Sequence, residues 1–212
     1  GAGATAVKFQ TYTADTMTLN LESLRISKDH ILWGDRTLYG LYKEAHTPWE
    51  WHAELFELCR SLNVIPFSSP FDLTAVDFLE SLNCSIYKIA SLETSDHTLI
   101  KKVAETGKPI IISTGIANIE DIELAVAACK RFGNQEIVLL KCTSSYPAPI
   151  EEANLSMIKD LADRFNVISG LSDHTLGSTV PILAVAFGAK IIEKHFIIDR
   201  SIGGPDASFS MN

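Results

Sequence analysis

The sequence lacks several features that would assign it to a specialised class of protein. None of its apolar runs reaches the roughly 18 residues that a membrane span needs. Its 18 basic and 26 acidic residues give a formal charge of −8, which argues against a general nucleic-acid binder. The four cysteines have no paired spacing and the first residues show no signal-peptide pattern, so we expect a cytoplasmic protein with reduced thiols.

What the sequence does contain is a regular alternation of short apolar runs and amphipathic segments. With 212 residues, 46% of them hydrophobic, the chain can bury a substantial core. The apolar runs predict strands at Ala6–Thr11, Val64–Phe67, Ile86–Ile89, Pro109–Ser113, Ile137–Cys142, Val167–Gly170 and Lys190–His195. The amphipathic segments predict helices at Trp49–Leu62, Asp72–Leu82, Thr98–Thr106, Ile119–Phe132, Leu155–Phe165 and Ser178–Phe187. Residues Leu19–His46 read as a long irregular loop.

This alternation predicts a parallel α/β fold. Runs such as Ile110-Ile111-Ile112 are apolar throughout, as strands covered on both faces are. The repeat fits a (β/α)8 TIM barrel that is incomplete here, because its first β-α unit and its last helix are missing. A doubly wound sheet is the alternative, although no Gly-x-Gly-x-x-Gly motif follows any predicted strand. We therefore expect residues 1–212 to be the barrel part of a longer protein.

Polar side chains lie at the ends of nearly all the predicted strands, where a barrel carries its active site. Lys8, Lys88 and several hydroxyl groups there are suited to bind a phosphate and a carboxylate. His174 and His195 follow adjacent strands beside carboxylates and are suited to hold a divalent metal. Each residue alone has a structural explanation, and Ser69 in particular could be a helix cap. Because such polar residues occur together at nearly all the predicted strand ends, we favour a functional role for them.

A short internal repeat helps to distinguish the roles of two histidines. Ser95-Asp96-His97-Thr98-Leu99 recurs as Ser172-Asp173-His174-Thr175-Leu176. His174 is about four residues past its predicted strand, near the barrel mouth, whereas His97 is about eight residues past its own. We therefore expect His174 to be the metal ligand and His97 to be a structural copy at the start of a helix.

Six motifs together resemble the sialic acid synthase family. They are Ala6-Val7-Lys8-Phe9-Gln10, Tyr87-Lys88-Ile89-Ala90-Ser91, Ser113-Thr114-Gly115, Gly170-Leu171-Ser172-Asp173-His174-Thr175, Glu193-Lys194-His195-Phe196 and Gly204-Pro205-Asp206. The resemblance implies a barrel catalytic domain followed by an antifreeze-like domain beyond Asn212. It also implies the condensation of phosphoenolpyruvate with an N-acetylated sugar aldehyde, with Mn or Mg as the divalent metal. Further motifs, such as Glu44-Ala45-His46-Thr47-Pro48-Trp49, resemble the pseudaminic acid synthase branch of the family.

The resemblance also implies a role for particular residues. The residues implied to bind phosphoenolpyruvate are Lys8, Ser69, Lys88, Ser91, Ser113, Ser144 and Ser172. Those implied to line the sugar site are Gln10, Glu93, Tyr146 and Asp206. His174 and His195 would bind the metal, and Lys8, Lys88 and Glu93 would be catalytic. The implied partners are small-molecule substrates and a second copy of the complete protein, with no nucleic acid and no membrane.

Three alternatives remain open on the sequence. The enzyme could be an N-acetylneuraminate or legionaminate synthase of the same family. It could be an aldolase that forms a Schiff base, with Lys88 or Lys141 as the nucleophile. It could also be a barrel that binds a sugar phosphate without catalysing a reaction.

Overall fold

The computed structural model describes residues 3–29 and 33–212. The chain forms two compact units, Gly1–Tyr87 and Lys88–Asn212. In both units the strands are parallel and follow one another in chain order, with helices between them. Among the described residues, no helix has both the length and the apolar composition needed to cross a membrane.

The first unit is built on two parallel strands, β1 (Ala6–Thr11) and β2 (Ile65–Pro70). Tyr87, which begins β3 (Tyr87–Ile89), pairs with Ser68 of β2. The helices of this unit are α1 (Ala14–Met17), α2 (Leu38–Ala45), the 3-10 turn η1 (Trp49–Trp51), α3 (His52–Ser61) and α4 (Leu73–Ser81). Both α3 and α4 pack against β2 and supply fully buried side chains such as Phe56 and Leu79.

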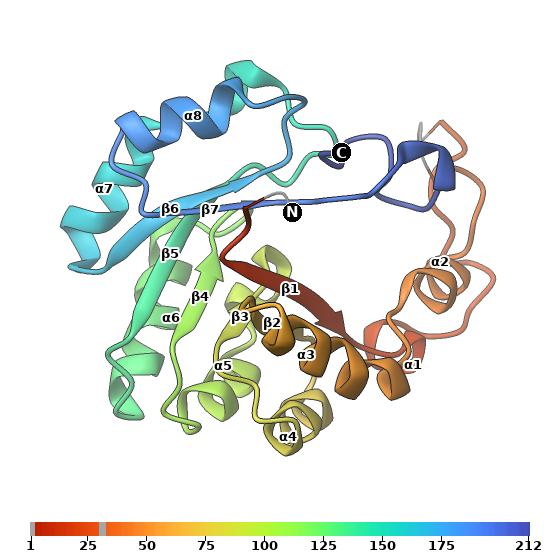
Figure 1. Cartoon of the computed structure of the whole chain (residues 1–212), viewed down its shortest axis with the longest axis horizontal. Coiled ribbons are helices and arrows are strands. Elements are labelled where there is room, and N and C mark those ends of the chain that lie inside the picture. The colour runs from red at the N-terminus through yellow and green to blue at the C-terminus, as the bar shows by residue number, and fades with distance from the viewer. Residues whose placement is uncertain (1–2, 30–32) are drawn as a thin grey trace. The chain divides into compact units, whose positions relative to one another are not determined.

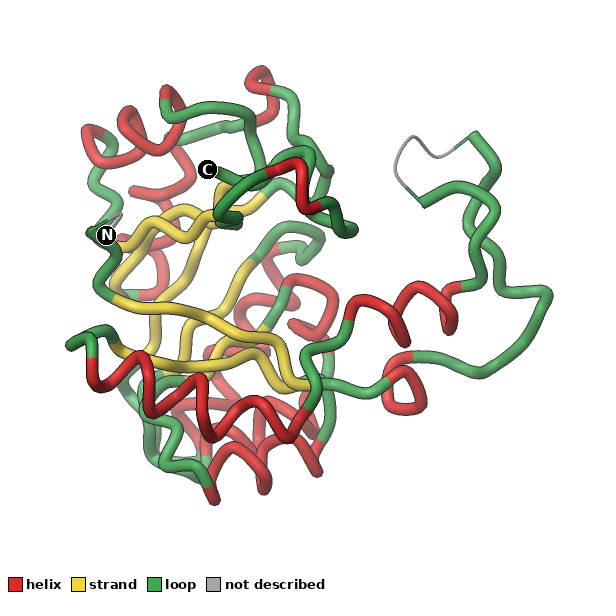
Figure 2. The backbone as a smooth tube through the Cα atoms, turned by 45° about the vertical axis from the view of Figure 1, so that its right-hand side comes forward, coloured by secondary structure: helices red, strands yellow, loops and turns green. Residues whose placement is uncertain are grey.

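The region predicted to be irregular, Leu19–His46, is in fact partly ordered into regular structure. It contains α2, and an antiparallel bridge joins Arg25 to Thr37. The Thr37 hydroxyl caps α2 by accepting a hydrogen bond from Gly40 N at 3.0 Å. The helix was missed although Leu38, Leu41, Tyr42 and Ala45 recur at helical spacing, because it is only eight residues long and contains Gly40, a poor helix former. Figure 2 shows the described parts of the loop between α1 and α2 extending away from strands β1 and β2.

A buried hydrogen-bond chain fixes the carboxyl ends of β1 and β2. The Thr11 hydroxyl lies 2.9 Å from His52 Nε2 and 2.7 Å from the Ser68 hydroxyl. All three side chains are fully buried, and burial lowers the pKa of His52 because it disfavours the imidazolium. Helix α3 is therefore tied to the end of β2 next to Ser69.

The second unit continues the same alternation (Figure 1). After residues 88–89 of β3, its strands are β4 (Ile110–Ser113), β5 (Ile137–Cys142), β6 (Ile168–Asp173) and β7 (Ile191–Lys194). Its helices are η2 (Ser91–Ser95), α5 (His97–Ala104), α6 (Ile119–Arg131), η3 (Ile150–Glu152), α7 (Ser156–Phe165), α8 (Thr179–Ala186) and η4 (Arg200–Ile202). Strands β4 to β7 pair in chain order, α7 packs against β5 and β6, and α8 packs against β6.

The predicted elements are confirmed, with corrections at their ends. Asn118 forms the capping box of α6, as its sequence position suggests. Ser69 is not a cap, because Asp72 accepts the backbone hydrogen bonds that begin α4. The sequence Thr47-Pro48-Trp49 also suggests a cap at Thr47, but the N-cap residue of η1 is Pro48, with no side-chain cap. Strands β2 and β6 run three residues beyond their predicted ends, and the parallel β-α order is that of the predicted (β/α)8 barrel.

Candidate active site

Three of the candidate residues lie on one face of the first unit. Lys8 and Gln10 are two residues apart on β1, so their side chains point to the same side of the strand. Gln10 pairs in register with Ser69 of β2, which places the buried Ser69 side chain on that side too. The strand pairing therefore gathers a cation, an amide and a hydroxyl at the carboxyl end of β1 and β2.

In the second unit, two candidate phosphoenolpyruvate ligands are joined by a carboxylate. Lys88 Nζ donates to both oxygens of Glu193, at 2.7 and 2.8 Å. The Ser172 hydroxyl donates to Glu193 Oε1 at 2.9 Å, as expected from the register pairing of these two residues. Lys88 is only 1% exposed, so its ammonium is held in a protein interior by this ion pair.

Gly115 lies in a closely packed part of the second unit. Its backbone N–H donates to the Ser91 hydroxyl at 3.1 Å. A Cβ atom added to Gly115 would lie 2.3 Å from Ser144 Oγ, 2.8 Å from Ser91 Oγ and 3.1 Å from Cys142 Sγ. Ser91 and Ser144 therefore converge over the glycine, as the predicted roles of these serines require.

The two candidate metal ligands lie side by side. The ring centroids of His174 and His195 are 5.3 Å apart. His174 Nδ1 lies 2.9 Å from the Thr143 carbonyl, which can only accept, so Nδ1 carries the hydrogen and Nε2 keeps its lone pair. His195 Nδ1 lies 3.3 Å from Asp206 Oδ2, which favours the same tautomer. The repeat copy His97 is instead exposed at the start of α5.

The donor chemistry of these histidines fits a divalent metal. Both turn Nδ1 toward an oxygen acceptor, the arrangement that metal-binding histidines commonly have. No group of three or more His, Cys, Asp or Glu side chains suited to a metal ion occurs among the described residues. Two histidines would therefore leave coordination positions for water or substrate.

An aromatic wall borders the two histidines. The ring of Tyr146 lies 4.4 Å from that of His174, and Phe209 lies 5.2 Å from His195. Burial, together with the smaller effects of the negative charges of Cys142, Asp206, Glu193 and Glu93, raises the pKa of Tyr146 to about 12. The Tyr146 phenol therefore stays protonated at neutral pH and can donate a hydrogen bond.

Four buried side-chain oxygens in the described part of the chain have no hydrogen-bond partner. They are Ser69 Oγ, Glu93 Oε2, Ser113 Oγ and Ser144 Oγ. An unsatisfied buried polar group costs about 1–3 kcal/mol, so each one calls for an explanation. All four belong to residues predicted to contact substrate. A polar ligand that supplies the missing partners explains the pattern.

Glu93 has a strongly perturbed carboxyl group. Burial, with a smaller contribution from the charge of Asp96, raises its pKa to about 7 against the opposing effect of a hydrogen bond from its own backbone N–H. A carboxyl group with this pKa exchanges its proton near neutral pH, as a general acid or base must.

The structure argues against a Schiff-base lysine. Lys141 is buried, and burial lowers its pKa, as such a nucleophile requires. However, its ammonium donates to Cys142 O, Thr143 Oγ1 and Glu152 O, which uses all three of its hydrogens. Lys88 is held as a cation by Glu193. Lys141 therefore ties β5 to η3 rather than facing a substrate.

Two residues of the site received no role from the sequence. Glu193 joins Lys88 to Ser172, and Gly115 leaves room for the two serines. Both residues stand in motifs of the family resemblance, Ser113-Thr114-Gly115 and Glu193-Lys194-His195-Phe196, and this is the signal that could have identified them. Their contacts could not be read from the motifs, because the partners of Glu193 and Gly115 come from distant parts of the chain.

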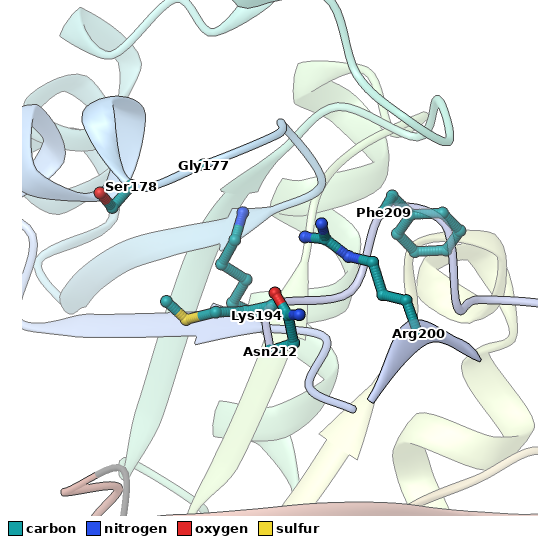
Figure 3. Close-up of a pocket in the computed structure, with 7 residues that line it drawn as sticks. Gly177, Ser178, Lys194, Arg200, Phe209 and Asn212 are labelled. Atoms are coloured by element: carbon teal, nitrogen blue, oxygen red, sulfur yellow. The ribbon is translucent and has the colours of Figure 1, made fainter. Parts of the chain in front are cut away.

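A cavity of about 210 Å³ lies on the other side of β7. Lys194 points into it, and because neighbouring strand residues face opposite sides, the cavity is on the face opposite Glu193. Figure 3 shows the side-chain ends of Lys194 and Arg200 directed toward one another there, with Gly177 and Ser178 nearby. The cavity therefore lies on the opposite face of β7 from Glu193 but shares Phe209 with the aromatic wall beside His195.

We expect Gly115→Ala to raise the KM for phosphoenolpyruvate at least about tenfold, because the added methyl group must displace Ser144 and Ser91. Steady-state kinetics on the complete protein measure it. Gly107→Ala is the control for the clash: a Cβ there would meet nothing within 4 Å, and its φ of +70°, which strains an alanine, makes it the harsher change for the backbone. An equal rise of KM in both variants would contradict the assignment.

Comparisons with known proteins show the family to which the chain belongs. The chain is 52% identical to pseudaminic acid synthase of Helicobacter pylori and 40% identical to N,N'-diacetyllegionaminic acid synthase of Legionella pneumophila, and both matches cover 100% of this chain. It spans 62% and 60% of the length of these two relatives. The crystal structure of N-acetylneuraminic acid (sialic acid) synthetase from Leptospira borgpetersenii superposes with a TM-score of 0.88 and 33% identity, over 99% of this chain and 68% of that one. The NeuB family model matches residues 1–212, and the chain therefore belongs to the NeuB family.

Proposed function

We propose that the complete protein condenses phosphoenolpyruvate with an acetamido-deoxy sugar aldehyde, which yields a nine-carbon nonulosonic acid and phosphate. The observation that carries this proposal is the set of four unpartnered buried oxygens, all on residues predicted to contact substrate. Phosphoenolpyruvate offers a phosphate and a carboxylate, whose oxygens would accept hydrogen bonds from the three serines of the set.

In the second unit, phosphoenolpyruvate would bind to Lys88 and to the serines Ser91, Ser113, Ser144 and Ser172. Lys88 is oriented by Glu193, Ser91 and Ser144 converge over Gly115, and Ser172 would turn its hydroxyl hydrogen from Glu193 to the ligand. Lys8 and Ser69 are the phosphoenolpyruvate contacts proposed for the first unit. The buried cation Lys88 would stabilise the negative charge of the phosphate in an environment of low dielectric.

The proposed reaction forms one C–C bond and one C–O bond and breaks the C–O bond to phosphate. The methylene carbon of phosphoenolpyruvate attacks the aldehyde carbon, which leaves positive charge on the carbon that bears the phosphate. Water adds to that carbon and gives one proton to the Glu93 carboxylate, and a proton is taken up by the former aldehyde oxygen, which becomes a hydroxyl. Phosphate then leaves with the bridging oxygen and takes the second proton of the water, and the product is a 2-keto acid. Glu93 suits this step because its pKa lies near 7 and its Oε2 has no partner in the protein.

The sugar would lie against the histidines and the aromatic wall. A divalent metal, Mn or Mg, held by His174 and His195 would polarise the aldehyde oxygen. Tyr146, Gln10 and Asp206 would contact the sugar hydroxyl and acetamido groups. The direct test is phosphate release by the complete protein, which should require phosphoenolpyruvate, the sugar and the metal together. A protein that binds phosphoenolpyruvate but releases no phosphate would be a binding barrel without catalysis.

We expect a 2,4-diacetamido-2,4,6-trideoxy hexose to be preferred over N-acetylmannosamine. The basis is the higher identity to a pseudaminic acid synthase, 52%, than to the N-acetylneuraminic acid synthetase of known structure, 33%. A difference of one methyl group in an apolar pocket is worth about 10- to 200-fold in kcat/KM, and an unpaired acetamido partner costs more. Competition between the two sugars measures the ratio. A higher kcat/KM for N-acetylmannosamine would overturn this substrate assignment and leave the reaction class standing.

A further inference from the structure

An ion pair joins the ends of β6 and β7 directly beside the two candidate metal ligands. Asp173 precedes His174, and Lys194 precedes His195. We propose that Asp173 and Lys194 are positioning residues that set the spacing of the two histidines and thereby the affinity for the metal. This inference rests on the proposed metal site at His174 and His195.

The contacts around Asp173 use both of its carboxylate oxygens. Oδ2 accepts a hydrogen bond from Lys194 Nζ. Oδ1 accepts from the Thr175 backbone N–H at 3.1 Å and from the Thr175 hydroxyl at 2.8 Å. Lys194 Nζ also donates to the Thr175 carbonyl at 2.6 Å. The residues on both sides of His174 are therefore fixed to one another and to β7.

The position of this pair in the sheet explains why it affects the histidines. Asp173 and Lys194 are register partners at the last rung of the β6–β7 ladder. Beyond this rung, no further β6–β7 pairing occurs among the residues described, although His174 and His195 come next on their chains. The ion pair therefore joins the two strands where the backbone hydrogen bonds between β6 and β7 end. The rings of His174 and His195, 5.3 Å apart, follow directly after it.

The pair is also protected from water and directed away from substrate. The side chains of Lys194 and Asp173 are 9% and 1% exposed. Because they alternate with Glu193 and Ser172 along the strands, they face the opposite side of the sheet from those two residues. A direct role in binding phosphoenolpyruvate is therefore excluded by geometry, whereas an action through the neighbouring histidines is not.

The test measures the affinity of the complete protein for Mn²⁺ alone by isothermal titration calorimetry. The double variant Asp173→Asn/Lys194→Gln removes both charges together and leaves no single buried charge uncompensated. We expect its Mn²⁺ affinity to fall about 10- to 100-fold, as is typical when the partners of metal-binding groups are lost. Lys194→Arg, which keeps the charge, should stay within about threefold of the wild type.

The exposed ion pair of α7 provides the matched control. Lys159 and Asp163 are separated by 2.6 Å and are 74% and 66% exposed, so Lys159→Gln/Asp163→Asn should leave the affinity unchanged. If the Asp173/Lys194 double variant does not fold, Thr175→Val removes one hydrogen bond to Asp173 without changing a charge, and it should weaken Mn²⁺ binding severalfold.

Two results would overturn the inference, and they can be told apart. Wild-type affinity in the folded Asp173/Lys194 or Thr175 variant, with loss of binding in His174→Ala, would remove the positioning role and leave the metal site intact. Wild-type affinity in both His174→Ala and His195→Ala would remove the metal site itself, and with it the positioning role.

Discussion

Replacing either His174 or His195 with alanine is expected to abolish metal-dependent turnover of the complete protein. Each change removes one of only two imidazoles, and the remaining ligand cannot hold a divalent ion at the low concentrations that support the wild type. The fold should persist, because both rings lie at the ends of strands whose ladder is already complete at Asp173 and Lys194. Phosphate release and Mn²⁺ titration measure the effect.

His97→Ala is the control that the sequence repeat itself provides. His97 stands in the same Ser-Asp-His-Thr-Leu context as His174, but it is exposed at the start of α5. Its removal should change neither turnover nor metal affinity. Unchanged turnover in both His174→Ala and His195→Ala would show that the two rings do not form the metal site.

Glu93→Gln is expected to lower kcat about 10²- to 10⁴-fold, the usual contribution of a positioned proton acceptor. Because the proposed step needs the carboxylate form, wild-type kcat/KM should rise with pH and level off above the Glu93 pKa of about 7. The amide cannot titrate, so the variant should lose this dependence. A pH profile of kcat/KM for both proteins measures the difference.

The control for Glu93 is Glu105→Gln on the surface of α5. Glu105 pairs with Lys101 at 3.8 Å, with about half of its side chain exposed, and such a pair contributes little. This variant should keep the wild-type profile. If kcat/KM of the Glu93→Gln variant still rises with pH near pH 7, another group is responsible for that titration. Glu93 would then have no part in the proposed step.

Most elements of the fold could be predicted because their apolar residues are bounded by clear turn signals. Strands β1 and β5 have the predicted bounds, and α6 ends one residue before its predicted end. The ends of β2 and β6 were predicted too early, because Ser68, Ser69, Ser172 and Asp173 look like loop residues. These polar groups are buried in the sheet, where contacts with distant residues outweigh their local preference.

The candidate site was only partly predictable for a related reason. Motifs identify residues such as His174 one at a time, but they do not reveal which side chains already bind one another. The ion pair of Lys88 with Glu193 spans 105 positions of sequence, and the space that Gly115 leaves depends on residues from separate loops. The roles of the individual residues toward substrate stay predictions.

The register of β6 and β7 also determines which changes of chain length the protein can tolerate. The ladder runs from Gly170 paired with Ile191 to Asp173 paired with Lys194. Because side chains alternate along a strand, inserting or deleting one residue within either strand would turn its histidine to the opposite side of the sheet. The turn between α8 and β7 is constrained as well, because Lys190 N–H donates to Ser169 O at 2.9 Å and Ala189 is buried against the core that contains Leu171 and Ala184. An insertion or deletion in either short strand should therefore cost more than a conservative substitution at an exposed position such as Ile168.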